Sequence, residues 1–153
     1  MANTRKVLER LPDDKFAWKA HEKSMSIGQM AAHLSHIPSW GVPTIELRVL
    51  DLTPVGGEPY TQPKVENRAD AIKYFDAGVA KFRTLLAEVS DASLMESWTL
   101  QMAGNPILTM PRVAVIRSMI LNHMIHHRAQ LTVYYRLNGI PVPALYGPSA
   151  DEK

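Results

Sequence analysis

The sequence contains no cysteine, which excludes a disulfide framework, a thiolate metal site and a cysteine nucleophile. It has no apolar run long enough to cross a membrane, and its first residues lack the charged-then-apolar pattern of a signal peptide. Its 17 basic and 15 acidic residues are interspersed, so it also lacks the concentrated basic face that nucleic-acid binding usually requires. We therefore expect a cytoplasmic protein with neither a membrane nor a nucleic acid as its partner.

The first half of the chain contains two segments with helical character. Residues 1–11 place apolar side chains on one side of a short helix. A second helix is predicted from Ser26 to about Ile37, because Ser26 and Gln29 have the spacing of a capping box. Prolines interrupt this helix, and it can resume over residues 44–50.

The second half begins with a long connection over residues 53–66, which contain three prolines and two glycines. A third helix follows over residues 67–89, where apolar residues repeat at steps of three and four. Residues 98–110 alternate in polarity and fit either a small hairpin or an irregular link. The last helix is predicted to begin at Pro111 and to continue to Asn138, where a glycine and a proline end it.

Four helical segments with few strands predict an all-α protein, a four-helix bundle with a long link between helices two and three. The 153 residues are most simply one domain over residues 1–153. A domain of this size buries about two thirds of its unfolded surface. No internal repeat or low-complexity segment divides the chain.

Three histidines lie within five positions of the last helix, at His123, His126 and His127. Each residue of an α-helix turns about 100°, so with His123 at zero His127 lies at about +40° and His126 at about −60°. The apolar residues of the same helix lie between about +20° and +60°; they are Ile116, Ile120 and Tyr134. His123 and His127 therefore belong to the apolar stripe, whereas His126 lies at its margin.

The second helix has one histidine with the same placement. Around His33, the apolar Met30 lies at about +60°, whereas His36 falls near −60°. If the two helices pack together, His33 joins His123 and His127, and three neutral imidazoles converge with positions open for water or substrate. Such a ligand set is typical of a catalytic metal site.

The residues alone allow the histidines more than one role. Histidine pairs at this spacing are more often hydrogen-bonded core or surface residues than metal ligands. The helix also lacks the glutamate of a zinc-protease motif, because Met124 follows His123. The chain is therefore a metal-dependent enzyme, a non-catalytic metal-binding or stress-related helical bundle, or a bundle whose histidines serve only the core.

Two segments resemble the DinB/YfiT-like family of metalloenzymes: SIGQMAAHLSHIPSW (residues 26–40) and NHMIHHRAQLTVYYRLNGIPVPALYGPSADE (residues 122–152). The resemblance spans a capped helix with one histidine, a long link, and the pattern H-x-x-x-H-R-x-Q followed by N-G-x-P-x-P. It implies a bundle of up-down-down-up order, commonly a homodimer. It also implies a divalent metal, nickel or zinc, held by residues that match His33, His123 and His127.

Relatives in this family include enzymes that use a low-molecular-weight thiol as nucleophile, such as bacillithiol, mycothiol or glutathione, and many are regarded as hydrolases. The resemblance therefore implies a metal that activates water or a thiol toward a small-molecule substrate. Because the chain has no cysteine, any such thiol must be external. Arg128 and Tyr134 are candidates for orienting an anionic substrate beside the metal.

Overall fold

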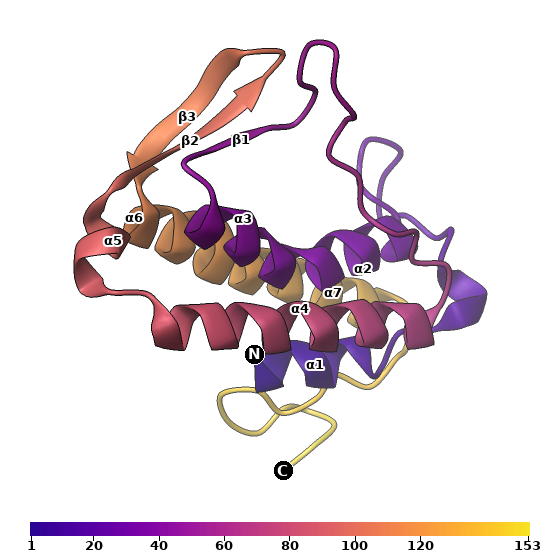
Figure 1. Ribbon diagram of the computed structural model, residues 1–153. Helices are drawn as coiled ribbons and strands as arrows, with labels where there is room; N and C mark the ends of the chain where they lie inside the picture. The colour runs from indigo at the N-terminus through magenta and orange to yellow at the C-terminus, as the bar shows by residue number, and fades with distance from the viewer.

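The structure, a computed structural model that describes residues 1–153, combines a layer of helices with a three-stranded mixed sheet (Figure 1). The sheet stands above one end of the helical layer, and a long link descends from it to the opposite end. The fold is therefore α+β, and the predicted all-α four-helix bundle is wrong. The prediction failed because residues 49–51 become a strand only by pairing with a distant segment, which no local pattern reveals.

The elements follow one another in this order: α1 (Ala2–Leu8), η1 (Asp13–Lys15), α2 (Ile27–His36), η2 (Ile37–Trp40), α3 (Gly41–Glu46), β1 (Val49–Asp51), α4 (Arg68–Glu88), α5 (Asp91–Met95), β2 (Ser97–Met102), β3 (Asn105–Pro111), α6 (Arg112–Val115), η3 (Ile116–Asn122) and α7 (His123–Leu137). The segments η1 and η2 are 3-10 helices, whereas η3 is a π-helix. Elements α6, η3 and α7 follow without interruption and form the last helix of the chain. None of the helices is both long and apolar enough to span a bilayer.

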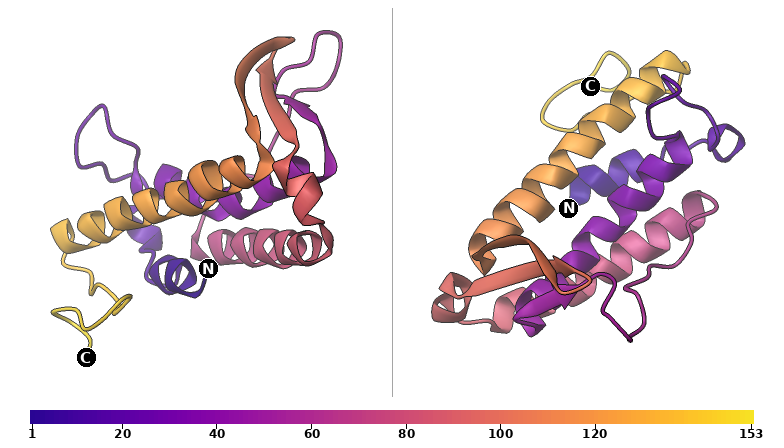
Figure 2. Two further views of the ribbon diagram at one scale, coloured as in Figure 1. Left: turned by 90° about the vertical axis from the view of Figure 1, so that its left-hand side faces the viewer. Right: turned by 90° about the horizontal axis from the view of Figure 1, so that it is seen from above.

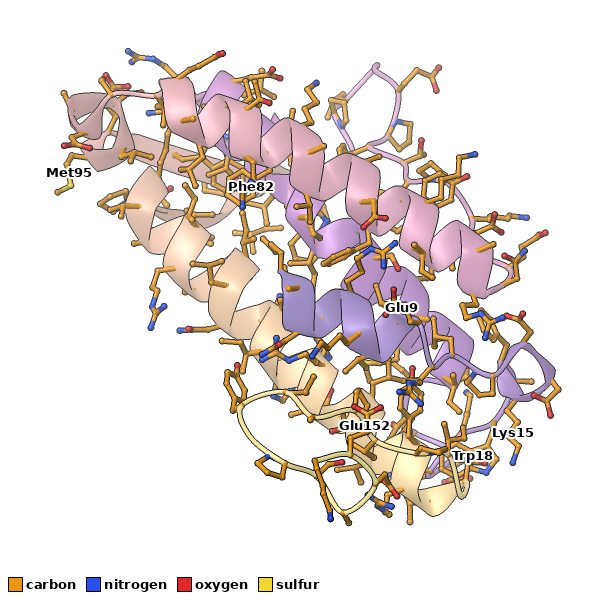
Figure 3. The ribbon with its side chains drawn as sticks, turned by 90° about the horizontal axis from the view of Figure 1, so that it is seen from below. Glu9, Lys15, Trp18, Phe82, Met95 and Glu152 are labelled. Carbon is orange, nitrogen blue, oxygen red and sulfur yellow. The ribbon has the colours of Figure 1, made fainter.

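The hydrophobic core lies where α1, α2, α4 and α7 meet, and Figure 3 shows α1 lying between α4 and the last helix. Its largest fully buried side chains are aromatic, with Phe75 and Phe82 on α4 and Tyr135 on α7. Burying each such ring stabilises the fold by about 2–3 kcal/mol. The third predicted helix is confirmed as α4, and Asn67 caps it by accepting from the Asp70 amide.

The second helix begins where the sequence predicts. Ser26 Oγ accepts from the Gln29 amide (3.1 Å) and Gln29 Oε1 accepts from the Ser26 amide (2.8 Å), so the capping box is complete. At the prolines the helix tightens into η2 and continues as α3, which ends at Glu46. The predicted continuation to residue 50 is wrong, because the backbone becomes extended at Leu47 and then forms β1.

In the sheet, β1 pairs in parallel with β2, and β2 pairs antiparallel with β3. The hairpin alternative for residues 98–110 is thereby confirmed. Its turn consists of Ala103 and Gly104, whose φ angles of 50° and 77° match the left-handed geometry of tight two-residue hairpins. Asp51 of β1 stabilises this turn, because its carboxylate accepts from the amides of Ala103 (3.0 Å) and Gly104 (2.7 Å).

The long connection is also confirmed, since the chain leaves β1 at Asp51 and enters helix again at Arg68. This link covers part of α2: Nε2 of His36 lies 2.9 Å from the carbonyl oxygen of Pro63. His36 is only 6% exposed as a result. The helical wheel had placed it at the margin of the apolar stripe, because a wheel cannot show that a distant loop will cover a position.

Candidate metal centre

The three histidines of the predicted ligand set come together in space. His33 comes from the last turn of α2, and His123 and His127 come from the first turns of α7. Nε2 of His123 lies 3.2 Å from Nε2 of His33 and 2.7 Å from Nε2 of His127. One nitrogen from each ring lies within 4.8 Å of the other two, so the group could hold a metal ion.

Two features of the helices produce this convergence. Helices α2 and α7 pack against each other and lie side by side when viewed from above (Figure 2, right). His123 and His127 are four residues apart on α7, so their rings project from the same face. The π-helical η3 ends directly before His123, and its wider turns change which residues share a face with the histidines.

The angles given to the residues of the last helix assumed one uninterrupted α-helix, and the π-helical η3 makes that assumption wrong. Ile116 and Ile120 are buried as predicted, but His123 and His127 are only half-buried and lie at the rim of the core. His126 is exposed, as its marginal position predicts. The histidine cluster therefore borders solvent, which leaves room for a ligand to approach it.

The surroundings favour the neutral form of all three imidazoles. Burial lowers the pKa of His33 to about 4, and the neighbouring His127 and His123 add to this lowering. Burial also lowers the pKa of His123, opposed by the Met119 carbonyl, and the pKa of His127, opposed by the hydrogen bond to Gln130. Near neutral pH the rings are therefore uncharged, which is the form that binds a metal.

Neighbouring side chains hold the rings in place. Nδ1 of His127 lies 2.8 Å from Oε1 of Gln130, and this contact puts the ring proton on Nδ1 and the lone pair on Nε2. The ring of Trp40 lies 5.4 Å from that of His33 and 5.5 Å from that of His123. The sequence contains a signal for the contact between His127 and Gln130, because residues three apart on a helix are neighbours. It also contains one for Trp40 beside His33, because residues seven apart on a helix lie on the same face.

A shared cation suits this donor set better than hydrogen bonds among the rings do. His127 offers only a lone pair at Nε2, and Nε2 of His123 has one proton at most for two neighbouring nitrogens. Nδ1 of His123 is buried and makes no hydrogen bond of normal geometry. Ligand nitrogens around a tetrahedral ion with bonds near 2.1 Å lie about 3.4 Å apart, which is farther than the 3.2 Å and 2.7 Å that separate Nε2 of His123 from the other two rings.

Two hollows meet at the histidine cluster. An apolar pocket of about 320 Å³ lies between the sheet and the last helix and reaches His123. A polar cleft of about 780 Å³ is open to solvent, lies along α2 and reaches His33 and His36. Gln62 of the link borders both. The cluster is therefore accessible from a polar side and from an apolar side.

The two candidates for substrate orientation lie outside this cluster. Arg128 is buried, and its guanidinium donates to the hydroxyls of Thr4 (3.2 Å) and Tyr146. Tyr134 is buried two turns beyond His127, and its ring lies 5.4 Å from that of Trp18. The contacts of Arg128 join α7 to α1 and to the C-terminal segment.

The comparisons with known proteins agree with one another. The DinB family matches residues 2–153. The chain is 28% identical over 149 residues to the uncharacterized protein YrdA of Bacillus subtilis strain 168, covering 97% of this chain and 83% of that protein.

Two crystal structures of DinB-like proteins have the same fold. The protein YjoA from Bacillus subtilis is 19% identical with a TM-score of 0.68, over 96% of this chain and 92% of that one. A protein from Bacillus cereus ATCC 10987 is 25% identical with a TM-score of 0.62, over 95% of this chain and 89% of that one. With a family match over nearly its whole length, the chain belongs to the DinB family.

Proposed function

We propose that this DinB-family protein is a metal-dependent enzyme whose divalent ion, nickel or zinc, is bound by His33, His123 and His127. The observation that carries the proposal is the convergence of the three Nε2 atoms, with His123 at 3.2 Å from His33 and at 2.7 Å from His127. Three neutral imidazoles from two helices leave further coordination positions free, as catalytic metal sites require.

The chemistry follows from the donor set. A divalent ion on three imidazoles supplies Lewis acidity, which lowers the pKa of a coordinated water or thiol toward neutrality. Since the chain has no cysteine, the thiol is a low-molecular-weight compound such as bacillithiol, mycothiol or glutathione. The reaction is accordingly a hydrolysis or a thiol-dependent transfer on a small molecule.

The residues around the cluster have separate roles in this proposal. Gln130 holds His127 with its lone pair toward the other two rings. Trp40 packs against His33 and His123 and restricts their rotation. Arg128 has no catalytic role here, because its guanidinium already binds two hydroxyls away from the histidine cluster.

Elemental analysis of the purified, zinc-loaded protein tests the metal site. We expect about one ion per chain in the wild type and almost none in His123→Ala, because two remaining imidazoles bind weakly. His126→Ala is the matched control, since His126 lies on the exposed side of the same helix. A His123→Ala protein with the metal content of the wild type would contradict the ligand assignment.

Catalysis is tested separately with the metal-loaded protein. We expect turnover in a panel of ester, amide and thiol-transfer substrates, lost on chelation and restored by the same metal. A protein that retains its ion but turns over neither the hydrolysis substrates nor the thiol-transfer substrates would be a non-catalytic metal-binding protein.

A further inference from the structure

The apolar pocket beside His123 has a continuous apolar roof. Leu50, Leu100 and Leu108 are direct cross-strand partners on β1, β2 and β3, so their side chains lie on one face of the sheet. All three line the pocket. The opposite face is polar at the neighbouring pair, where the hydroxyls of Thr99 and Thr109 lie 2.9 Å apart.

The floor of the pocket comes from the last helix, with Val115 of α6 and Met119 and Ile120 of η3. No Asp, Glu, Lys or Arg side chain lines the pocket. Burying a charged group there would remove its hydration without providing a partner. The pocket therefore selects against charge.

Most polar groups of the lining are already paired within the protein. The hydroxyl of Thr44 donates to the Trp40 carbonyl (2.8 Å), and the indole N–H of Trp98 donates to the Pro43 carbonyl (3.1 Å). The other polar side chains of the lining are those of Trp40, Tyr60, Gln62 and His123, of which Gln62 donates to the hydroxyls of Ser39 and Tyr60 (3.4 Å each). His123 is part of the histidine cluster and Trp40 packs against it, so a ligand that turns its polar end toward these two residues presents that end to the cluster.

We propose that this pocket binds an uncharged aromatic or aliphatic group of the substrate, with the reacting polar end directed to His123. The inference rests on the proposed function, since it assigns the substrate class of the same site. The volume of the pocket, about 320 Å³, limits the size of the group that it can hold. A cavity of about 150 Å³ accommodates benzene, so one substituted ring or a short branched chain fits.

The test uses 4-bromobenzyl mercaptan, titrated into metal-free and cobalt-loaded protein. Trp40 and Trp98 line the pocket, so bromine bound there quenches their fluorescence with or without metal. The visible absorption of cobalt reports independently whether the thiol reaches the ion. We expect saturable quenching in both forms, and at least about tenfold tighter binding to the cobalt form than 2-mercaptoethanol shows, because a buried ring removes apolar surface from water.

Two further comparisons test the absence of charge in the lining. The carboxylated probe 4-(mercaptomethyl)benzoate should bind the cobalt form at least about tenfold more weakly than benzyl mercaptan, because the pocket offers no partner for its charge. Leu108→Glu should weaken the binding of 4-bromobenzyl mercaptan by a similar factor and leave the binding of 2-mercaptoethanol unchanged. Ile107→Glu is the matched control, since Ile107 is the preceding residue of β3, is 54% exposed and does not line the pocket.

The outcomes separate the two proposals. Saturable quenching in a protein that binds no cobalt upholds the pocket and rejects the metal site. A cobalt response to thiols with no preference for the aromatic probe rejects the pocket and leaves the metal site standing. The absence of both responses rejects both. The wild-type comparison does not depend on either variant folding.

Discussion

Helix α7 presents polar side chains on two faces. On one face, Arg128 and Tyr135 are buried and each has a partner within the protein: the guanidinium donates to Thr4 and Tyr146, and the phenol donates to the Val7 carbonyl (2.8 Å). On the other face, His123 and His127 turn their Nε2 atoms toward each other and toward a third imidazole.

The two faces differ in whether each polar side chain finds its hydrogen-bond partners within the protein. The first face is a closed set of hydrogen bonds, which stabilises the packing of α7 against α1 and the C-terminal segment, seen from below in Figure 3. On the second face, the imidazole nitrogens offer more lone pairs than there are N–H groups to donate to them. A bound cation would complete this arrangement. Burial alone does not identify a functional group; an incomplete set of partners does.

The largest expected effect comes from the first face. Tyr135→Ala should lower the free energy of unfolding by about 3–5 kcal/mol, because Tyr135 is fully buried and the substitution leaves a cavity. Urea denaturation measures the change. Tyr135→Phe keeps the ring and should lose only about 1 kcal/mol with the hydrogen bond. The folded fraction of either variant should bind metal as the wild type does; a variant that lost metal without losing stability would break the comparison.

Gln130→Leu should act on the second face alone. We expect metal affinity to fall by about 10–100-fold, because His127 loses the acceptor that orients its ring. The free energy of unfolding of the metal-free protein should change by less than about 0.5 kcal/mol. Competition with a chromophoric chelator measures the affinity. Gln130→Glu retains an acceptor and should stay close to wild type, whereas unchanged affinity in Gln130→Leu would remove Gln130 from the site.

Ser26→Ala tests whether the start of α2 influences the position of His33. The loss of the capping box should lower the free energy of unfolding by about 1 kcal/mol, measured in urea. His33 lies in the last turn of the helix, at the end opposite Ser26, so its ring should stay in place and the metal affinity should not change. A tenfold loss of affinity would show that the two functions of α2, packing and ligand placement, are coupled.

The last prediction concerns the pH dependence of the metal-free protein. The pKa of His33 falls from 6.5 to about 4 on folding, and the pKa values of His123 and His127 also fall. Between these values the unfolded chain binds more protons than the folded one, so the free energy of unfolding should decrease as the pH is lowered from 6.5 toward 4. Thermal unfolding at a series of pH values measures the slope. In His33→Gln the slope should be shallower, and an unchanged slope would show that this imidazole is not desolvated by folding.

The site was more predictable than the fold class. His33, His123 and His127 were identified from their spacing on two helices, and the structure brings them together. The all-α prediction was wrong because β1 has only three residues, too few to show an alternating pattern. The depth of His36 was also missed, since the link that covers it is distant in sequence.

By itself, the sequence determined the start of α2, the start and length of α4 and the residues of the histidine cluster, and it offered the hairpin as one of two alternatives. These features depend on caps, turns and periodicity, which act between residues a few positions apart. Only the tertiary structure decided the parallel pairing of Leu50 with Leu100, the π-helical η3 before His123 and the apolar pocket between them. Those features depend on contacts between segments far apart along the chain, whose ordering entropy is compensated only once the whole core has formed.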